Sequence, residues 1–230
     1  MRVEIDNLWK RYRGTAALRG VSLSFEPGCV TGVLGENGSG KSTLFRIIAG
    51  VTHASDGTVR IDGVAVGSET RARTAYLPET DSFYPWMSVE EQLEFLSRFF
   101  AGWNVTKSRE LLDFMRLTPG DRIAELSQGQ RARLKIVAAF SWPSRLVVMD
   151  EPFNGIDPPS RKRILEVLMR EYRVDSQSIL ISTHMVDEVE ELVENVVYLH
   201  DGEVAISGRA DDLRQEKGGS LSDIFEEVVL

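Results

Sequence analysis

Apolar positions follow two patterns along the chain. Residues 3–9 (VEIDNLW) and 21–25 (VSLSF) alternate apolar and polar side chains, which is typical of half-buried antiparallel strands. Four other runs are continuously apolar and end in polar residues, as buried parallel strands covered by helices do: 30–35 (VTGVLG), 145–150 (RLVVMD), 178–182 (SILIS) and 195–200 (NVVYLH). The pattern predicts an α/β fold with a mainly parallel sheet and an N-terminal antiparallel β subdomain.

The segment 83–141 has no clear strand pattern and shows helical spacing instead. Ser88 and Glu91 form an S-x-x-E capping box, the signature of a helix start, and a further helix is expected at about 106–117. The last ten residues, LSDIFEEVVL, are predicted to form a short amphipathic helix.

A third helix start, LSQGQ at 126–130, contains a residue that helices disfavour. Ser127 and Gln130 form an S-x-x-Q capping box, yet Gly129 in the first turn costs about 1 kcal/mol relative to Ala. A bare backbone at a capped helix N-terminus points N–H groups and the helix dipole at an anion. We therefore expect Gly129 to serve a purpose other than helix stability.

Length and composition limit the classes of protein that fit. The 230 residues suit one domain, in which a helical subdomain (83–141) is inserted into a core formed by 1–82 and 142–230. No apolar run is long enough to cross a bilayer and no signal peptide is evident, so a cytosolic protein is expected. Cys29 is the only cysteine, which excludes an internal disulfide, and the net charge of −8 argues against a general nucleic-acid binder.

The sequence GENGSGKST matches the P-loop pattern G-x-x-x-x-G-K-[ST]. A buried-strand pattern precedes it and a helix pattern follows it, with Gly50 as the helix stop. Lys41 is expected to reach the β- and γ-phosphates of a nucleotide, and Ser42 to ligate Mg²⁺. The alternative is a glycine-rich turn without a ligand. The predicted cradle consists of Gly35, Glu36, Asn37, Gly38, Ser39, Gly40, Lys41, Ser42 and Thr43.

Two consecutive acids, Asp150 and Glu151, end the predicted strand RLVVMD. Burying a charge is costly unless the charge is paired or coordinated. Asp150 is expected to lie beside the P-loop and hold Mg²⁺ through water, and Glu151 to act as the general base that activates the attacking water. Alternatively, both are acids placed where a strand meets solvent.

The P-loop, the acidic pair and LSQGQ stand in the order and spacing of the ATP-binding-cassette (ABC) ATPases, and the chain resembles this family over essentially its whole length. The resemblance implies that Tyr12 stacks on adenine, that His184 contacts the γ-phosphate, and that Asp157 communicates across a dimer. It further implies that LSQGQ is the signature motif, usually LSGGQ. Ser127, Gly129 and Gln130 would then bind the ATP held by a second cassette.

Three residues or motifs depart from the family pattern. Glu79 replaces the usual Gln of the loop after YLP, where a carboxylate can still bind Mg²⁺ or water. Gln128 replaces the third signature residue, usually Gly, and the D-loop reads NGID (154–157) where SALD is commoner. None of these changes removes a group needed for phosphoryl transfer, so the resemblance implies an active ATPase.

The resemblance also implies partners. The short ending GGSLSDIFEEVVL resembles bacterial exporter-type cassettes, which implies a peripheral protein on the inner face of the membrane, bound to integral membrane permease subunits and to a second cassette, identical or related. The aromatic-rich stretch 83–103 is expected mainly as subdomain core, with Tyr84, Pro85 and Trp86 in a groove for the permease's coupling helix. The alternative is a soluble ABC ATPase that switches a nucleic-acid or protein complex. A GTPase lacks support because no N-K-x-D motif occurs.

Overall fold

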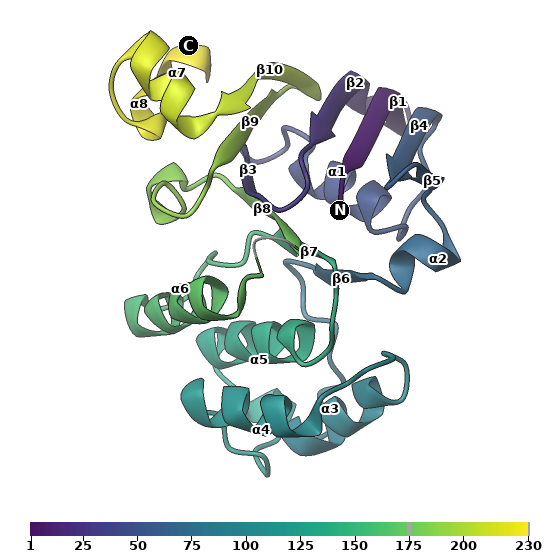
Figure 1. The fold of residues 1–230 in the computed structure, drawn as a ribbon, viewed down its shortest axis with the longest axis vertical. Helices are drawn as coiled ribbons and strands as arrows, with labels where there is room; N and C mark the ends of the chain where they lie inside the picture. The colour runs from purple at the N-terminus through teal and green to yellow at the C-terminus, as the bar shows by residue number, and fades with distance from the viewer. Residues whose placement is uncertain (174–175, 230) are drawn as a thin grey trace. The chain divides into compact units, whose positions relative to one another are not determined.

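The structure, a computed structural model, describes residues 1–173 and 176–229 (Figure 1). The chain divides into two compact units. The first consists of residues 1–76, 145–151 and 173–230, and the second of 77–144 and 152–172. The predicted domain limits stay a prediction; in the structure the helix at 158–171 is grouped with the second unit.

Two sheets form the first unit. Within the described residues, the smaller sheet is antiparallel in the order β2-β1-β4-β5, and the larger has the order β10-β9-β3-β8-β7-β6. In the larger sheet β3 pairs in parallel with β8 and β9, and β7 pairs in parallel with β8, which confirms the predicted α/β class. The strands are β1 (Val3–Tyr12), β2 (Thr15–Phe25), β3 (Val30–Leu34), β4 (Asp56–Ile61), β5 (Val64–Ala65), β6 (Thr74–Leu77), β7 (Leu146–Asp150), β8 (Ser178–Thr183), β9 (Asn195–His200) and β10 (Glu203–Arg209).

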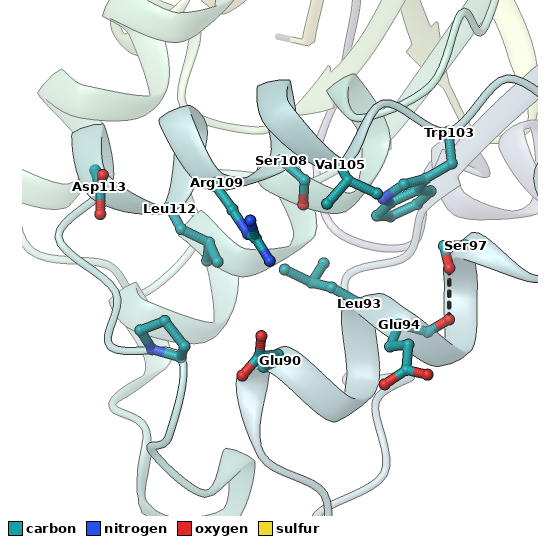
Figure 2. A pocket seen from close by; sticks show the side chains of 11 residues that line it. Glu90, Leu93, Glu94, Ser97, Trp103, Val105, Ser108, Arg109, Leu112 and Asp113 are labelled. Carbon is teal, nitrogen blue, oxygen red and sulfur yellow. Dashed lines mark hydrogen bonds between the residues drawn. The ribbon is translucent and has the colours of Figure 1, made fainter.

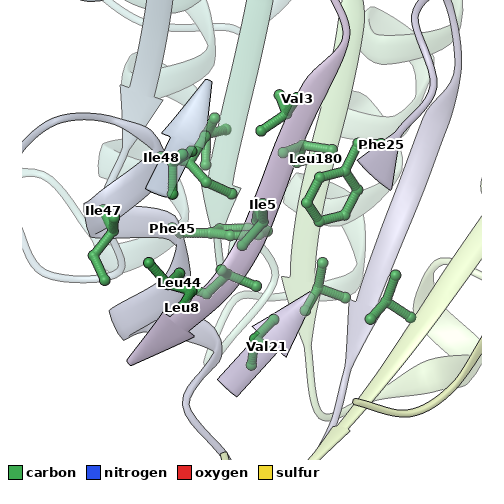
Figure 3. Close-up of a cluster of buried hydrophobic side chains, with 14 of the residues drawn as sticks. Val3, Ile5, Leu8, Val21, Phe25, Leu44, Phe45, Ile47, Ile48 and Leu180 are labelled. Atoms are coloured by element: carbon green, nitrogen blue, oxygen red, sulfur yellow. The ribbon is translucent and has the colours of Figure 1, made fainter. Parts of the chain in front are cut away.

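A hydrophobic core joins the two sheets of the first unit to helix α1 (Lys41–Ile48) (Figure 3). Leu44, Phe45 and Ile48 of α1 are at most 1% exposed and pack with Val3 of β1 and Leu180 of β8. Burying each such side chain contributes roughly 1.5–3 kcal/mol. This packing fixes the start of α1, and therefore the P-loop, against the carboxyl end of β3.

The second unit is helical (Figure 1). Both predicted capping boxes are present: Ser88 exchanges hydrogen bonds with Glu91 at the start of α3, and Ser127 with Gln130 at the start of α5. No helix in the described part of the chain is both long and apolar enough to span a bilayer. The remaining helices of both units are α2 (Ser68–Arg71), α3 (Val89–Ser97), α4 (Val105–Phe114), η1 (Ile123–Glu125), α5 (Gln128–Phe140), α6 (Pro158–Glu171), η2 (Val186–Glu188), α7 (Ala210–Lys217) and α8 (Leu221–Val229). Residues 174–175 and Leu230 of the predicted tail lie outside the described residues.

Candidate functional site

The P-loop forms the turn between β3 and α1. Gly40 caps α1 with a left-handed φ of 107°, and Lys41 is the first helical residue. Glu36, Asn37 and Gly38 are exposed, whereas Ser39 is 5% exposed and its hydroxyl has no hydrogen-bond partner in the described part of the chain. An unpaired buried hydroxyl is costly. A phosphate oxygen would supply this partner, so the loop fits a nucleotide.

A chain of buried ionic contacts lies beside the P-loop. The Lys41 ammonium donates to the carbonyls of Gly35 (2.7 Å) and Glu36 (3.0 Å) and lies 3.2 Å from Glu151 Oε1. Glu151 Oε2 lies 3.0 Å from His184 Nδ1. The Lys41 and Glu151 side chains are 4% and 5% exposed, so their opposite charges offset much of the cost of burial. The structure therefore brings three of the predicted residues together in one contact chain.

The backbone at Glu151 turns this carboxylate out of the strand. Glu151 follows the last residue of β7 and adopts φ 47°, a left-handed conformation that costs a non-glycine residue roughly 1–2 kcal/mol. Its N–H donates to the carbonyl and the hydroxyl of Ser182, both at 3.1 Å. The neighbouring strand β8 thus holds the strained residue in place.

Asp150 accepts hydrogen bonds from three sides and is 1% exposed. Ser42 Oγ lies 2.9 Å and Ser182 Oγ 2.8 Å from Asp150 Oδ1, and Tyr76 Oη lies 3.4 Å from Oδ2. Burial, and then the charge of Asp150, raise the pKa of Tyr76 to about 12. Asp150 was expected beside the P-loop, and it lies there in contact with Ser42. The oxygens of the two side chains form a donor set that suits Mg²⁺.

Tyr76 and Ser182 are members of this site that the sequence analysis did not predict. Tyr76 is the first residue of YLPET, and Ser182 precedes His184 by two positions at the end of SILIS. Ser182 could have been found from its position, because polar residues near the carboxyl ends of neighbouring parallel strands meet at one edge of the sheet. Tyr76 lies in β6, a strand that the sequence analysis did not predict.

Tyr12 is the last residue of β1, an interior strand of the smaller sheet. Its side chain is 42% exposed, and the Lys10 ammonium lies 4.8 Å from the ring centroid. Thr43, in the first turn of α1, is half-buried. The stacking of Tyr12 on adenine stays a prediction.

The signature residues belong to the second unit. Ser127 is exposed, whereas Gly129 is buried, and a Cβ added to Gly129 would lie 2.5 Å from Asp157 Oδ1 and 2.6 Å from Ser160 Oγ. Asp157 caps α6: its carboxylate accepts from the Ser160 hydroxyl (2.7 Å) and N–H (3.0 Å), which lowers the pKa of Asp157. Asp157 of the D-loop thus occupies the space that a side chain at position 129 would need, which explains the glycine.

Glu79 also lies in the second unit. Its Oε1 accepts a hydrogen bond from Asn154 Nδ2 at 3.0 Å. Ser42 and Asp150 belong to the first unit. The role of Glu79 as a Mg²⁺ ligand stays a prediction.

A cavity of about 420 Å³ lies between α3 and α4 of the second unit (Figure 2). Leu93 and Leu112 supply an apolar floor, and Glu90, Glu94 and Arg109 lie at its rim. Its lining lacks a paired acid and base next to a phosphate cradle. The chemistry of the protein is therefore assigned to the P-loop of the first unit.

The family model described as ABC transporter matches residues 18–154. ABC transporter ATP-binding protein YtrB of Bacillus subtilis is 30% identical over 216 residues, covering 93% of this chain and 74% of that protein. Nod factor export ATP-binding protein I of Rhizobium etli is 35% identical over 223 residues, covering 93% and 70%. A solved structure of an ATP-binding subunit of an ABC transporter matches with a TM-score of 0.88 and 30% identity, covering 99% of each chain.

These matches confirm the family that the motifs predicted, and they agree with the contacts among the P-loop, Asp150 and Glu151. The match extends over nearly the whole chain, so it concerns the complete fold as well as the P-loop. The chain therefore belongs to the ABC transporter family, as an ATP-binding subunit that hydrolyses ATP.

Proposed function

We propose that this subunit pairs with a second cassette around two ATP molecules and drives export through a membrane-embedded permease. The observation that carries the proposal is the contact chain from Lys41 through Glu151 to His184 beside the P-loop. A cation, a carboxylate and an imidazole beside a P-loop would surround the terminal phosphate of a bound nucleotide. Such a set serves phosphoryl transfer to water.

Different residues of the first unit would bind the phosphates, the adenine and the Mg²⁺ of MgATP. Ser39 and the backbone N–H groups from Gly35 to Thr43 would hold the phosphates, and Tyr12 would stack on the adenine. Ser42 and Asp150 would hold Mg²⁺, whose charge offsets the charge that develops on the transferred phosphoryl group. Glu79 is retained as a further candidate ligand, because Asn154 occupies only its Oε1.

Hydrolysis would use the carboxylate that Lys41 holds in this structure. When phosphate oxygens take the ammonium of Lys41, Glu151 is released from its ion pair and can accept a proton from water. The water oxygen then forms a bond to the γ-phosphorus while the bond from this phosphorus to the bridging oxygen breaks, giving ADP and phosphate. His184, in contact with Glu151 Oε2, keeps the carboxylate oriented.

The variant Glu151→Gln tests this assignment. It should bind ATP but hydrolyse it about 10²- to 10⁴-fold more slowly, the usual contribution of a general base. Unreacted ATP should then hold two chains together as a dimer on a sizing column. Glu191→Gln, a change of an exposed acid, is the matched control and should turn over normally. Normal turnover in Glu151→Gln would remove Glu151 as the base.

The permease would dock on an aromatic surface of the second unit, defined by Tyr84, Trp86, Phe95 and Phe99. Tyr84 contacts Trp86 and Phe95 at centroid distances of 5.0 and 5.4 Å, and Trp86 and Phe99 are 67% and 69% exposed. Exposed aromatic side chains gathered in this way mark protein interaction sites. The surface supports the predicted groove for a coupling helix, and with it a peripheral location at the inner face of the membrane.

Export is the direction favoured by the named relatives. One of them is a Nod factor export protein and another is a linearmycin resistance protein of Bacillus subtilis, 30% identical over 225 residues. The alternative, a soluble switch on a nucleic-acid or protein complex, is not favoured by these matches. The second cassette of the dimer is either an identical chain or a related one.

A further inference from the structure

Two basic residues of α5 fasten the loop that carries Glu79. The Lys135 ammonium donates to three consecutive carbonyls, those of Pro78 (2.8 Å), Glu79 (3.0 Å) and Thr80 (3.1 Å). Arg131 Nε lies 2.6 Å from Asp81 Oδ2. The Lys135 side chain is 13% exposed, and burial lowers its pKa. The Lys135 ammonium also lies 3.6 Å from Asp81 Oδ1. A largely buried ammonium with these partners restrains the loop, because moving the loop away would leave the charge unpaired.

A second connection joins the same loop to the first turn of α5 through the D-loop. Glu79 Oε1 accepts from Asn154 Nδ2, and the Asn154 carbonyl accepts from Gln128 Nε2, each at 3.0 Å. Gln128 is the first residue of α5, and Lys135 lies two turns further along the same helix. Glu79, Asn154, Gln128 and Lys135 thus form a closed set of contacts, called here the loop–helix network.

Gly155 makes room for this network. It has a φ of 67°, and a Cβ added there would lie 2.7 Å from Gln128 Nε2. The Gln128 side chain therefore occupies the space that a side chain at position 155 would need. The three departures noted in the sequence, at Glu79, at Gln128 and in NGID, meet in this network.

We propose that Asn154, Gln128 and Lys135 are positioning residues that make the Glu79 loop and the N-terminus of α5 move together. The Glu79 loop leads directly into the aromatic surface, and the N-terminus of α5 presents Ser127 and Gly129. The state of the permease-docking surface would thereby set the position of the signature residues. This inference rests on the proposed function, because it concerns the regulation of the same site.

The first test removes single links of the network. Asn154→Ala deletes the donor to Glu79, and Gln128→Ala deletes the donor to Asn154. In each variant kcat for ATP hydrolysis should fall by about 2- to 30-fold, which is the effect expected when a residue that couples two sites is changed. KM for ATP should stay unchanged, because the P-loop belongs to the other unit. The double variant should be no slower than the slower single variant, because both changes open the same closed set.

The second test separates positioning from metal binding at Glu79. Glu79→Gln keeps an oxygen that accepts from Asn154, so its kcat should exceed that of Glu79→Ala, and Glu79→Ala should match Asn154→Ala. The Mg²⁺ concentration for half-maximal activity should stay normal in Asn154→Ala. Lys135→Met should lower kcat in the same way, and Lys162→Met, a change of an exposed lysine on α6, should not. Thermal unfolding of every variant shows that the fold is kept.

Failure of the proposed function can be distinguished from failure of the loop–helix network alone. A wild-type chain that does not hydrolyse ATP would overturn the proposed function, and the inference with it. Normal hydrolysis by the wild type together with normal kcat in Asn154→Ala and Gln128→Ala would overturn the network alone. A multiplicative loss in the double variant would also count against it, because independent sites behave in that way.

Discussion

At the scale of single residues, the site depends on the buried ion pair of Lys41 with Glu151 and on the left-handed backbone of Glu151. Lys41, Ser42, Asp150 and Glu151 could be predicted because a strand-to-helix motif and the end of a buried strand are recognisable patterns. His184 was predicted from the resemblance to the ABC ATPases. The left-handed backbone of Glu151 and its ion pair with Lys41 could not be predicted from the sequence. Both depend on contacts across strands that are far apart in the sequence.

Tyr76 is expected to affect how the stability of the protein depends on pH. Its pKa is about 12 in the folded protein and about 10 when unfolded, so the unfolded chain releases this proton first as the pH rises. The stabilisation is complete below pH 10 and is lost progressively as the pH rises to about 12. In Tyr76→Phe the melting temperature should therefore fall less steeply between pH 10 and 12 than in the wild type. Tyr84→Phe, a change of an exposed tyrosine, is the control. Parallel curves for wild type and Tyr76→Phe would contradict the assignment.

At the scale of elements, the helix starts were the most readable feature. Ser88 and Ser127 begin capping boxes, and both helices begin one residue later. The strands β4, β5, β6 and β10 were not predicted. Of these, β5 has two residues, and β10, an antiparallel partner of β9, is mostly exposed and lacks an apolar run. A strand of this kind is defined by its partner, and the partner is not visible in the local sequence.

The purpose of Gly129 shows the same limit. The sequence indicated that a bare backbone was required and suggested an anion as the reason. Within this chain the space beside Gly129 is taken by Asp157 and Ser160, which follow it by about thirty residues. Close packing against a distant loop leaves no local pattern in the sequence. The requirement for glycine at position 129 could therefore be predicted, whereas its contact with Asp157 and Ser160 could not.

The aromatic surface yields a prediction for α3 and the residues before it. Trp86→Glu places a charge on the exposed aromatic surface, and a charge there must lose its hydration when a permease helix covers it. The variant should lose co-purification with the permease while its melting temperature stays close to that of the wild type. Val105→Glu, a change of an exposed apolar residue on α4, is the matched control and should co-purify normally. Undiminished co-purification of Trp86→Glu would place the docking surface elsewhere.

At the scale of the whole molecule, the motifs for one reaction are distributed over two compact units. The first unit holds the P-loop, Asp150, Glu151 and His184, and the second holds Ser127, Gly129 and Asp157. ATP binding should therefore depend on the first unit, and dimer formation should require the second as well. The two activities are predicted to be separable by mutation.

Ser127→Arg tests this separation. Ser127 is exposed at a helix N-terminus whose N–H groups attract an anion, and the proposed anion is the terminal phosphate of ATP bound to another cassette. A bulky arginine in that position should prevent the second cassette from approaching, so ATP should still bind while ATP-induced dimers and hydrolysis are lost. The change also removes a helix cap, at a cost of about 1 kcal/mol. Ser88→Arg removes the same kind of cap from α3 of the same unit and controls for this cost, because it should leave dimer formation intact. If both variants dimerise equally well on a sizing column in the Glu151→Gln background, Ser127 lies outside the interface and the second active-site half must be sought elsewhere.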